Sequence, residues 1–224
     1  MTIFNIISYD LKVLFRRKGA ITNMVAFFVI ISSLFPLALG PESETLKSVG
    51  IGVVWICALL SSTISLARVF EEDFESGILE QLYLQPIIPQ IIYISKALSH
   101  WISSGLPIVV ISPFILLMFD IEKEIIISSS LALALGSLII SFIGTMGAAV
   151  IIGIKRGAGL LSILLMPLYI PALVFGNGMS EAIIFGKNSE QFLSNMYGLL
   201  AIFFVILPLG LWSSSYSIKA ALED

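Results

Sequence analysis

Six long stretches without a charged residue constrain this chain more than any other feature. Each is at least 20 residues long, and about 20 apolar residues in a helix span the roughly 30 Å hydrocarbon core of a membrane. In lipid every backbone amide must find its partner within its own segment, so each stretch is expected to be α-helical. The predicted spans lie at about residues 20–40, 49–67, 97–119, 125–153, 158–176 and 195–217.

Composition favours a membrane protein over a soluble one. Of the 224 residues, 58% are hydrophobic and only 12% are charged, whereas a typical soluble domain has roughly 25% charged residues. Core helices of a large soluble domain would need polar faces, and these stretches have almost none. The predicted fold class is therefore an all-α integral membrane protein, with residues 1–224 forming a single membrane domain of six transmembrane helices.

The distribution of basic residues predicts the orientation of the chain. If the N-terminus is cytoplasmic, nine Lys and Arg residues lie on the cytoplasmic side and three on the other, as the positive-inside rule requires. Six spans then return the C-terminus to the cytoplasm. In residues 1–18 apolar side chains recur at helical spacing, with Asp10 and the basic residues between them, which predicts an amphipathic helix on the inner membrane surface. On the outer side, the segment 176–192 is expected to be a loop, whose apolar patch Ala182–Phe185 is either ordinary loop or a re-entrant or interface-lying helix.

Residues 68–90, between the second and third predicted spans, concentrate negative charge. Five of the fifteen carboxylates fall within ten residues here: Glu71, Glu72, Asp73, Glu75 and Glu80. A helix over 69–84 would place apolar residues on one side and most acids on the other, and Gly77 is expected to break or bend it. Anionic lipid cannot hold an acidic element, and its apolar side chains call for a partner surface. We therefore predict a cytoplasmic coupling hairpin that docks on a soluble protein with basic edges, such as a transport ATPase; the alternative is a solvated polar loop.

Several kinds of chemistry have no sequence support. The chain has no Walker loop, zinc-hydrolase motif or nucleophile elbow, so it is predicted not to be an enzyme, with ATP hydrolysis expected in a separate subunit. No charged residue lies in the middle of a predicted span, which disfavours a proton-coupled carrier. Lys155 and Arg156 lie in a glycine-rich cytoplasmic turn, where they are either topology anchors or a second contact with the same soluble partner.

Nearly end to end, the chain resembles the cytochrome c maturation protein B family, also called heme exporter protein B. Stretches that carry the resemblance are FPLALGPE (35–42), VVWICALLSS (53–62), KALSHWISSGLPIVVISP (96–113) and GIKRGAGLLSILLMPLYIPALVFG (153–176). The family's hinge reads roughly F-x-x-D-x-x-x-G-x-L-E-Q-L-x-L-x-P. In this chain the pattern is supplied by Phe70, Asp73, Gly77, Leu79, Glu80, Gln81, Leu82, Leu84 and Pro86.

The resemblance implies an ABC-2-type permease-like bundle in a bacterial inner membrane. It also implies that the hinge docks on an ATPase subunit through Phe70, Asp73, Gly77, Leu79, Glu80, Gln81, Leu82 and Pro86. The implied partners are a cytoplasmic ABC ATPase, a heme-handling membrane subunit, a small helper subunit and a periplasmic heme chaperone, with no nucleic acid.

The implied function is heme export or delivery for c-type cytochrome biogenesis, with ATP-driven loading or release of the chaperone. Heme is then a candidate cargo and ATP belongs to the partner, so no cofactor is expected to be bound directly. The alternative is a membrane scaffold or lever that couples the ATPase to the heme-handling subunit without a transport path. The single histidine, His100, follows Lys96 by one turn beside Trp101, so it is expected to be a headgroup-depth anchor, with axial heme ligation as the alternative.

Overall fold

A computed structural model describes residues 3–16, 18–40, 42–66, 68–152, 154, 157–184 and 189–223. These residues form helices and no strand, which confirms the predicted all-α fold class. In order they are α1 (Ile3–Arg16), α2 (Lys18–Leu39), α3 (Ser43–Leu66), α4 (Arg68–Glu75), α5 (Ile78–Tyr83), α6 (Pro89–His100), the π-helix η1 (Trp101–Gly105), α7 (Leu106–Met118), α8 (Lys123–Val150), α9 (Gly157–Ile184) and α10 (Ser189–Glu223).

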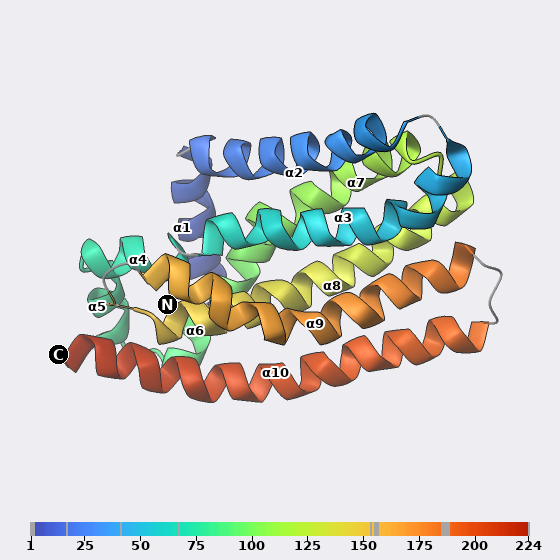
Figure 1. Cartoon of the computed structure of the whole chain (residues 1–224). Helices are drawn as coiled ribbons and strands as arrows, with labels where there is room; N and C mark the ends of the chain where they lie inside the picture. Colours follow the sequence, from blue (N-terminus) through green and yellow to red (C-terminus); the bar gives the residue numbers. More distant parts are fainter. Residues whose placement is uncertain are drawn as a thin grey trace.

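The long helices form a bundle of membrane spans. Within the described ranges, six helical stretches are long and apolar enough to cross a membrane, as the charge-free runs predict. They are Ile21–Leu39, Ser43–Glu75, Pro89–Met118, Ile125–Val150, Ile163–Ala182 and Glu190–Glu223. Figure 1 shows these helices running lengthwise beside one another, whereas α1 crosses one end of the bundle. The short helices α4 and α5 and the two ends of the described chain lie at that same end (Figure 1). The chain is thus a multi-pass membrane protein.

The segment 176–192 is more helical than the sequence predicts. Helix α9 continues to Ile184 and α10 begins at Ser189, so the described part of the segment is not a loop. Ala182 to Ile184 form the last turn of α9 rather than a separate re-entrant or interface-lying helix, and Phe185 lies outside the described residues. A charged residue such as Glu181 can end a membrane span without ending the helix that contains it. Within α9, Asn177 donates a hydrogen bond to Glu181 one turn later (2.7 Å).

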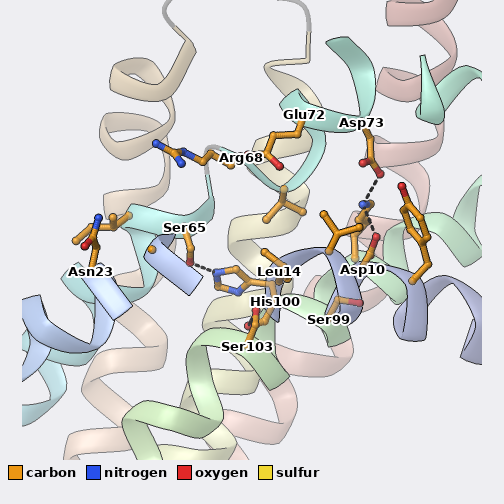
Figure 2. A pocket seen from close by; sticks show the side chains of 16 residues that line it. Asp10, Leu14, Asn23, Ser65, Arg68, Glu72, Asp73, Ser99, His100 and Ser103 are labelled. Carbon is orange, nitrogen blue, oxygen red and sulfur yellow. Dashed lines mark hydrogen bonds and ion pairs between the residues drawn. The ribbon is translucent and has the colours of Figure 1, made fainter. Parts of the chain in front are cut away.

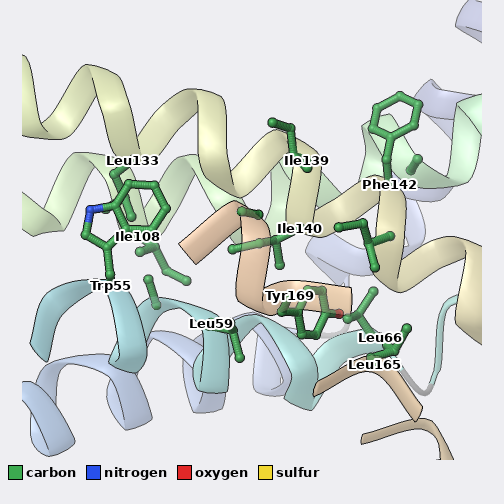
Figure 3. Packing of buried hydrophobic residues seen from close by; sticks show 14 of the residues in the cluster. Trp55, Leu59, Leu66, Ile108, Leu133, Ile139, Ile140, Phe142, Leu165 and Tyr169 are labelled. Atoms are coloured by element: carbon green, nitrogen blue, oxygen red, sulfur yellow. The ribbon is translucent and has the colours of Figure 1, made fainter. Parts of the chain in front are cut away.

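The spans pack closely because small residues face large ones. Trp55 of α3 is 1% exposed, and its indole lies directly against Gly136 of α8 and Gly176 of α9. A Cβ atom at either glycine would overlap the ring. The indole N–H donates to Ser180 of α9 (3.4 Å). Figure 3 shows Trp55 beside Leu133 in this core. Trp55 therefore joins three helices at one point, which is how membrane helices gain contact area.

A π-helical turn interrupts the third span. η1 (Trp101–Gly105) lies between α6 and α7, just before Pro107. Proline has no backbone N–H, and its ring crowds the carbonyl four residues earlier, here that of Ser103. The wider π turn thus coincides with the place where a regular α-helix would lose a hydrogen bond.

At the opposite end of the bundle, Asp120, which follows α7, contacts the first turns of α3. Its backbone lies in the left-handed region (φ 57°), which is uncommon for a residue other than glycine. The Ser43 hydroxyl donates a hydrogen bond to its carboxylate, and the Lys47 ammonium lies 3.6 Å away. The Ser43 hydrogen bond and then the Lys47 charge lower the pKa of Asp120. This contact fixes the start of α3 beside the end of α7.

The contact of Trp55 with Gly176 gives the first testable prediction. Gly176→Ala forces the added methyl group into the indole ring, so we expect the free energy of unfolding to fall by about 1–3 kcal/mol. Gly52→Ala, on the same helix as Trp55, is the matched control, because the nearest atom to its new Cβ is 3.9 Å away. Thermal unfolding in detergent compares the two variants. Equal melting temperatures would show that the contact does not hold α3 to α9.

Candidate functional site

The coupling element, residues 68–90, folds as the two short helices α4 and α5. Between them Gly77 adopts φ 73°, in the left-handed region that favours glycine, so the predicted break at Gly77 is confirmed. α5 ends at Tyr83, and Pro89 begins α6 at a position where its missing N–H leaves no helix bond unmade. The element lies at the same end of the bundle as α1 (Figure 1).

The inward face of the coupling element packs on the bundle of the same chain. Phe70 is 1% exposed, Leu79 0% and Leu82 6%. Phe74, Ile78 and Tyr83 are partly buried against the same hydrophobic core. From the sequence, these apolar side chains are expected to need the surface of another protein. The structure supplies that surface within the chain, so these residues fix the element to the bundle.

The outward face of the coupling element is acidic with apolar edges. Apart from Arg68 at the start of α4, the exposed residues of the element are Glu71, Glu75, Ser76, Glu80, Gln81, Leu84, Gln85, Pro86 and Ile88. Leu84 is 76% exposed and Ile88 is 62% exposed. Of the predicted docking residues, Glu80, Gln81 and Pro86 therefore lie on the surface that another protein can reach, and Phe70, Leu79 and Leu82 do not.

Asp73, a further docking candidate, belongs to a buried ion cluster. The Lys96 ammonium of α6 donates to Asp73 Oδ2 of α4 (2.5 Å) and to Asp10 Oδ1 of α1 (2.9 Å). The side chains of Lys96 and Asp10 are each 6% exposed, and that of Asp73 is 13% exposed. We call these three residues the ion clasp. Figure 2 shows how it brings three helices together.

The ion clasp holds two carboxylates and one ammonium away from water. Burial raises the pKa of Asp10, since it disfavours the charged form; the Lys96 charge opposes that rise and the Asp73 charge adds to it. A buried charge that loses its partner is strongly destabilising, more so than a surface ion pair. The positions of α1, α4 and α6 therefore depend on one another.

A cavity of about 450 Å³ adjoins the ion clasp. Side chains from α1, α2, α3, α4, α6 and η1 surround it (Figure 2). The buried part of the lining includes Asp10, Lys96, Ser99 and His100, whereas Arg68 is exposed at its edge. The lining combines charged, hydroxyl and apolar groups, which is typical of a site for an amphipathic ligand.

His100 is part of a hydrogen-bonded network inside the bundle. Its ring is 3% exposed, with Nδ1 2.9 Å from the Ser141 hydroxyl and Nε2 2.9 Å from the Ser65 hydroxyl. Ser65 also lies 2.7 Å from the Ser104 hydroxyl of η1. The expected headgroup anchor is therefore wrong for His100, because the ring faces neighbouring helices. Axial heme ligation would require it to give up one of these hydrogen bonds.

Lys155 and Arg156, the candidate second contact, lie outside the described residues. The sequence did not predict the pairing of Asp10 with Lys96, because the two residues lie 86 positions apart in different predicted helices. One signal was available: Asp10 follows the buried Ile6 by four residues and so occupies the buried face of α1.

Comparisons with known proteins find one family. The model of the CcmB protein family matches residues 1–220. Heme exporter protein B of Pseudomonas aeruginosa is 39% identical over 203 residues, covering 91% of this chain and 91% of that protein. The protein of the same name from Escherichia coli K12 is 36% identical over 201 residues (90% and 91%). That from Paracoccus denitrificans is 35% identical over 214 residues (96% and 97%).

Removing the central cation tests the ion clasp. Lys96→Met leaves two buried carboxylates without their ammonium, so we expect the free energy of unfolding to fall by about 3–5 kcal/mol. Amide hydrogen exchange in α1 and α4 should become faster, because both helices lose the same partner. Melting temperature and exchange mass spectrometry measure the two effects.

Two further variants control this experiment. Lys219→Met removes a 56% exposed lysine of a surface pair with Glu223, and we expect a change within about 0.5 kcal/mol. Combining Lys96→Met with Asp10→Asn and Asp73→Asn should recover part of the loss, since no buried charge then lacks a partner. Unchanged exchange of α1 and α4 in Lys96→Met would refute the clasp.

Proposed function

Because the chain belongs to the CcmB protein family, we propose that it is the membrane (permease) subunit of an ABC transporter complex for c-type cytochrome biogenesis. The observation that carries the proposal is the family match over residues 1–220. Relatives named heme exporter protein B, matched over 91% of this chain in one case, support a role in heme export or delivery.

The proposed complex divides the work among several subunits. ATP is bound and hydrolysed by a separate cytoplasmic ABC ATPase. A heme-handling membrane subunit, a small helper subunit and a periplasmic heme chaperone are the other partners. This chain lies in the bacterial inner membrane with both termini in the cytoplasm. The gathering of α1, the coupling element and both ends of the described chain at one end of the bundle supports placing them on the same side of the membrane (Figure 1), and the excess of Lys and Arg on that side favours the cytoplasm.

The outward face of the coupling element is the proposed ATPase contact. Glu71, Glu75 and Glu80 supply negative charge, and the exposed Leu84 and Ile88 supply apolar surface at the edge. Complementary charge speeds association and fixes orientation, and apolar contact adds affinity. Such a surface suits a groove with basic edges.

The ion clasp gives a physical route from this contact into the membrane. Asp73 ties α4 to Lys96 of α6, and α6 continues through η1 into α7 as the helical stretch Pro89–Met118. A displacement of α4 therefore acts on the third span and, through Asp10, on α1. Such coupling requires the ATPase to contact the element differently in its two nucleotide states, because equal contact would shift no equilibrium.

A second candidate function is a lever or scaffold without a transport path through this chain. The packing of Trp55 against Gly136 and Gly176 favours it, because the indole fills the space between α3, α8 and α9. A planar cargo could pass there only by separating these helices.

Heme movement distinguishes the two functions. The assembled complex is placed in sealed vesicles with ATP, heme and the chaperone. For the lever, we expect ATP-dependent loading or release of the chaperone when heme is supplied on the chaperone's side, with no heme crossing the membrane. ATP-dependent accumulation of heme across the membrane would instead establish transport. Vesicles without ATP give the background.

Charge reversal on the outward face tests the proposed ATPase contact. Glu80→Arg places a cation opposite basic groove edges, so we expect co-purification of the ATPase to fall by about tenfold and c-type cytochrome levels to fall with it. Glu223→Arg, at the exposed end of α10, is the matched control and should leave both unchanged. Leu82 is unsuitable for this test because it is buried, so its loss would act through folding. Normal co-purification with Glu80→Arg, at equal protein amount, would contradict the proposal.

A further inference from the structure

Helix α1 has a side that its contact with the bundle does not use. Ile6 and Asp10, one turn apart, are buried, and Asp10 is bonded to Lys96 of α6. Away from this contact the helix carries an open groove of about 550 Å³. The groove is lined by Phe4, Ile7, Ser8, Leu11, Lys12 and Arg16. All of these residues belong to α1, so no other described helix lines the groove.

Two strips of different chemistry run along the groove. Side chains four or seven residues apart lie on the same strip of a helix. Phe4 and Leu11 form an apolar strip, and Phe4 is 76% exposed. Lys12 and Arg16 form a basic strip beside it, and both are exposed. The helix therefore has three strips: one on the bundle, one apolar and one basic.

The two cations of the basic strip have no carboxylate partner in the part of the chain that the structure describes. By contrast, the exposed Lys219 lies 3.7 Å from the Glu223 carboxylate. Lys12 and Arg16 lie on successive turns, so one phosphate group can accept hydrogen bonds from both. A basic strip without carboxylates of its own indicates an anionic partner.

The position of α1 indicates that this anion belongs to a lipid. Figure 1 shows α1 crossing one end of the bundle, transverse to the spans, so it runs along the membrane surface. Arg16 ends α1 five residues before Ile21, where the first candidate span begins, which places the basic strip at headgroup depth. An interfacial helix buries its apolar strip among acyl chains while its basic strip contacts headgroups. A soluble phosphate compound would leave Phe4 and Leu11 unused.

We propose that the groove on α1 binds an anionic phospholipid, with the phosphate between Lys12 and Arg16 and an acyl chain along Phe4 and Leu11. The sequence predicts only that α1 is amphipathic. In the structure the ion clasp occupies one side of the helix and leaves this groove for lipid. Lipid bound here holds α1 in the headgroup layer, and the ion clasp extends that hold to α4. The site is separate from the outward face of the coupling element and depends on neither the ATPase contact nor the cargo.

Lipid binding to the whole purified chain tests the proposal. The protein is delipidated in neutral detergent and titrated with phosphatidylglycerol and with phosphatidylcholine of the same acyl chains, and native mass spectrometry reports the bound fraction. We expect phosphatidylglycerol to bind about tenfold more tightly or better, since each cation beside an anionic headgroup contributes about fivefold. Raising the ionic strength should reduce this preference, because exposed charges are screened.

Paired charge variants locate the phosphate. Lys12→Gln combined with Arg16→Gln should lower the preference for phosphatidylglycerol at least fivefold. Lys123→Gln combined with Lys219→Gln is the matched control, because it removes two exposed cations that do not line the groove, and it should keep the preference. All four side chains are exposed, so both variants are expected to fold, and an unchanged melting temperature in lipid-free detergent checks this.

A second pair of variants locates the acyl chain. Phe4→Ser should weaken the binding of both lipids alike, because the apolar strip does not distinguish their headgroups. Leu37→Ser on α2 is the control: Leu37 is 77% exposed, close to the value for Phe4, but does not line the groove. It should leave the preference and the affinity of the α1 site unchanged.

Four results would overturn the proposal. One is equal binding of phosphatidylglycerol and phosphatidylcholine to the unaltered protein. Another is the same loss of preference in the two paired charge variants, which would show general attraction to a charged surface. The third is competition by soluble glycerol phosphate as strong as that by the lipid, which would assign the groove to a free phosphate. The fourth is an unchanged lipid preference in Lys12→Gln with Arg16→Gln together with loss of a partner subunit from the purified complex, which would assign the groove to a protein.

Discussion

The burial of one lysine ammonium between two carboxylates determines how α1, α4 and α6 are arranged. Lys96 joins Asp10, 86 residues away in the chain, and Asp73, 23 residues away. Helices α4 and α5 have 8 and 6 residues, too short to be stable alone. Their positions therefore come from burial of Phe70, Leu79 and Leu82 and from the ion clasp. Without the Lys96 ammonium, the Asp73 carboxylate would be more stable exposed to water than buried.

The membrane part of the bundle is held together by a different kind of interaction. Lipid is as apolar as the helix surfaces, so spans associate through close packing and hydrogen bonds rather than through the hydrophobic effect. Gly136 and Gly176 allow Trp55 to fill the space among three helices. Among the described residues, many buried serines bond to a carbonyl of their own helix, as Ser61 does to the Cys57 carbonyl (2.6 Å). The network around His100 instead joins α3, α6, η1 and α8, and it lies beside the cavity.

The fold of this chain could be predicted from its sequence more fully than the candidate site could. Absence of charge reveals a span because ionised groups are costly in lipid, so six spans were predictable. The end of α9 was not, because Glu181 can leave the membrane while its helix continues. Helical periodicity showed that Phe70 and Leu79 share an apolar face, but periodicity does not say what that face contacts. The Asp10–Lys96 pair depends on tertiary contact between α1 and α6, which the spacing within either segment cannot encode. The role of Glu80 and Gln81 in docking stays a prediction.

Asp10 belongs to both the ion clasp and the cavity, and this links the two sites energetically. One carboxylate oxygen accepts from the Lys96 ammonium, and Ser99, which also lines the cavity, contributes a hydrogen bond to the same carboxylate. A group that entered the cavity and contacted Asp10 would therefore change the strength of the clasp. Linkage is reciprocal, so a movement of α4 that opens the clasp would change binding in the cavity by the same factor.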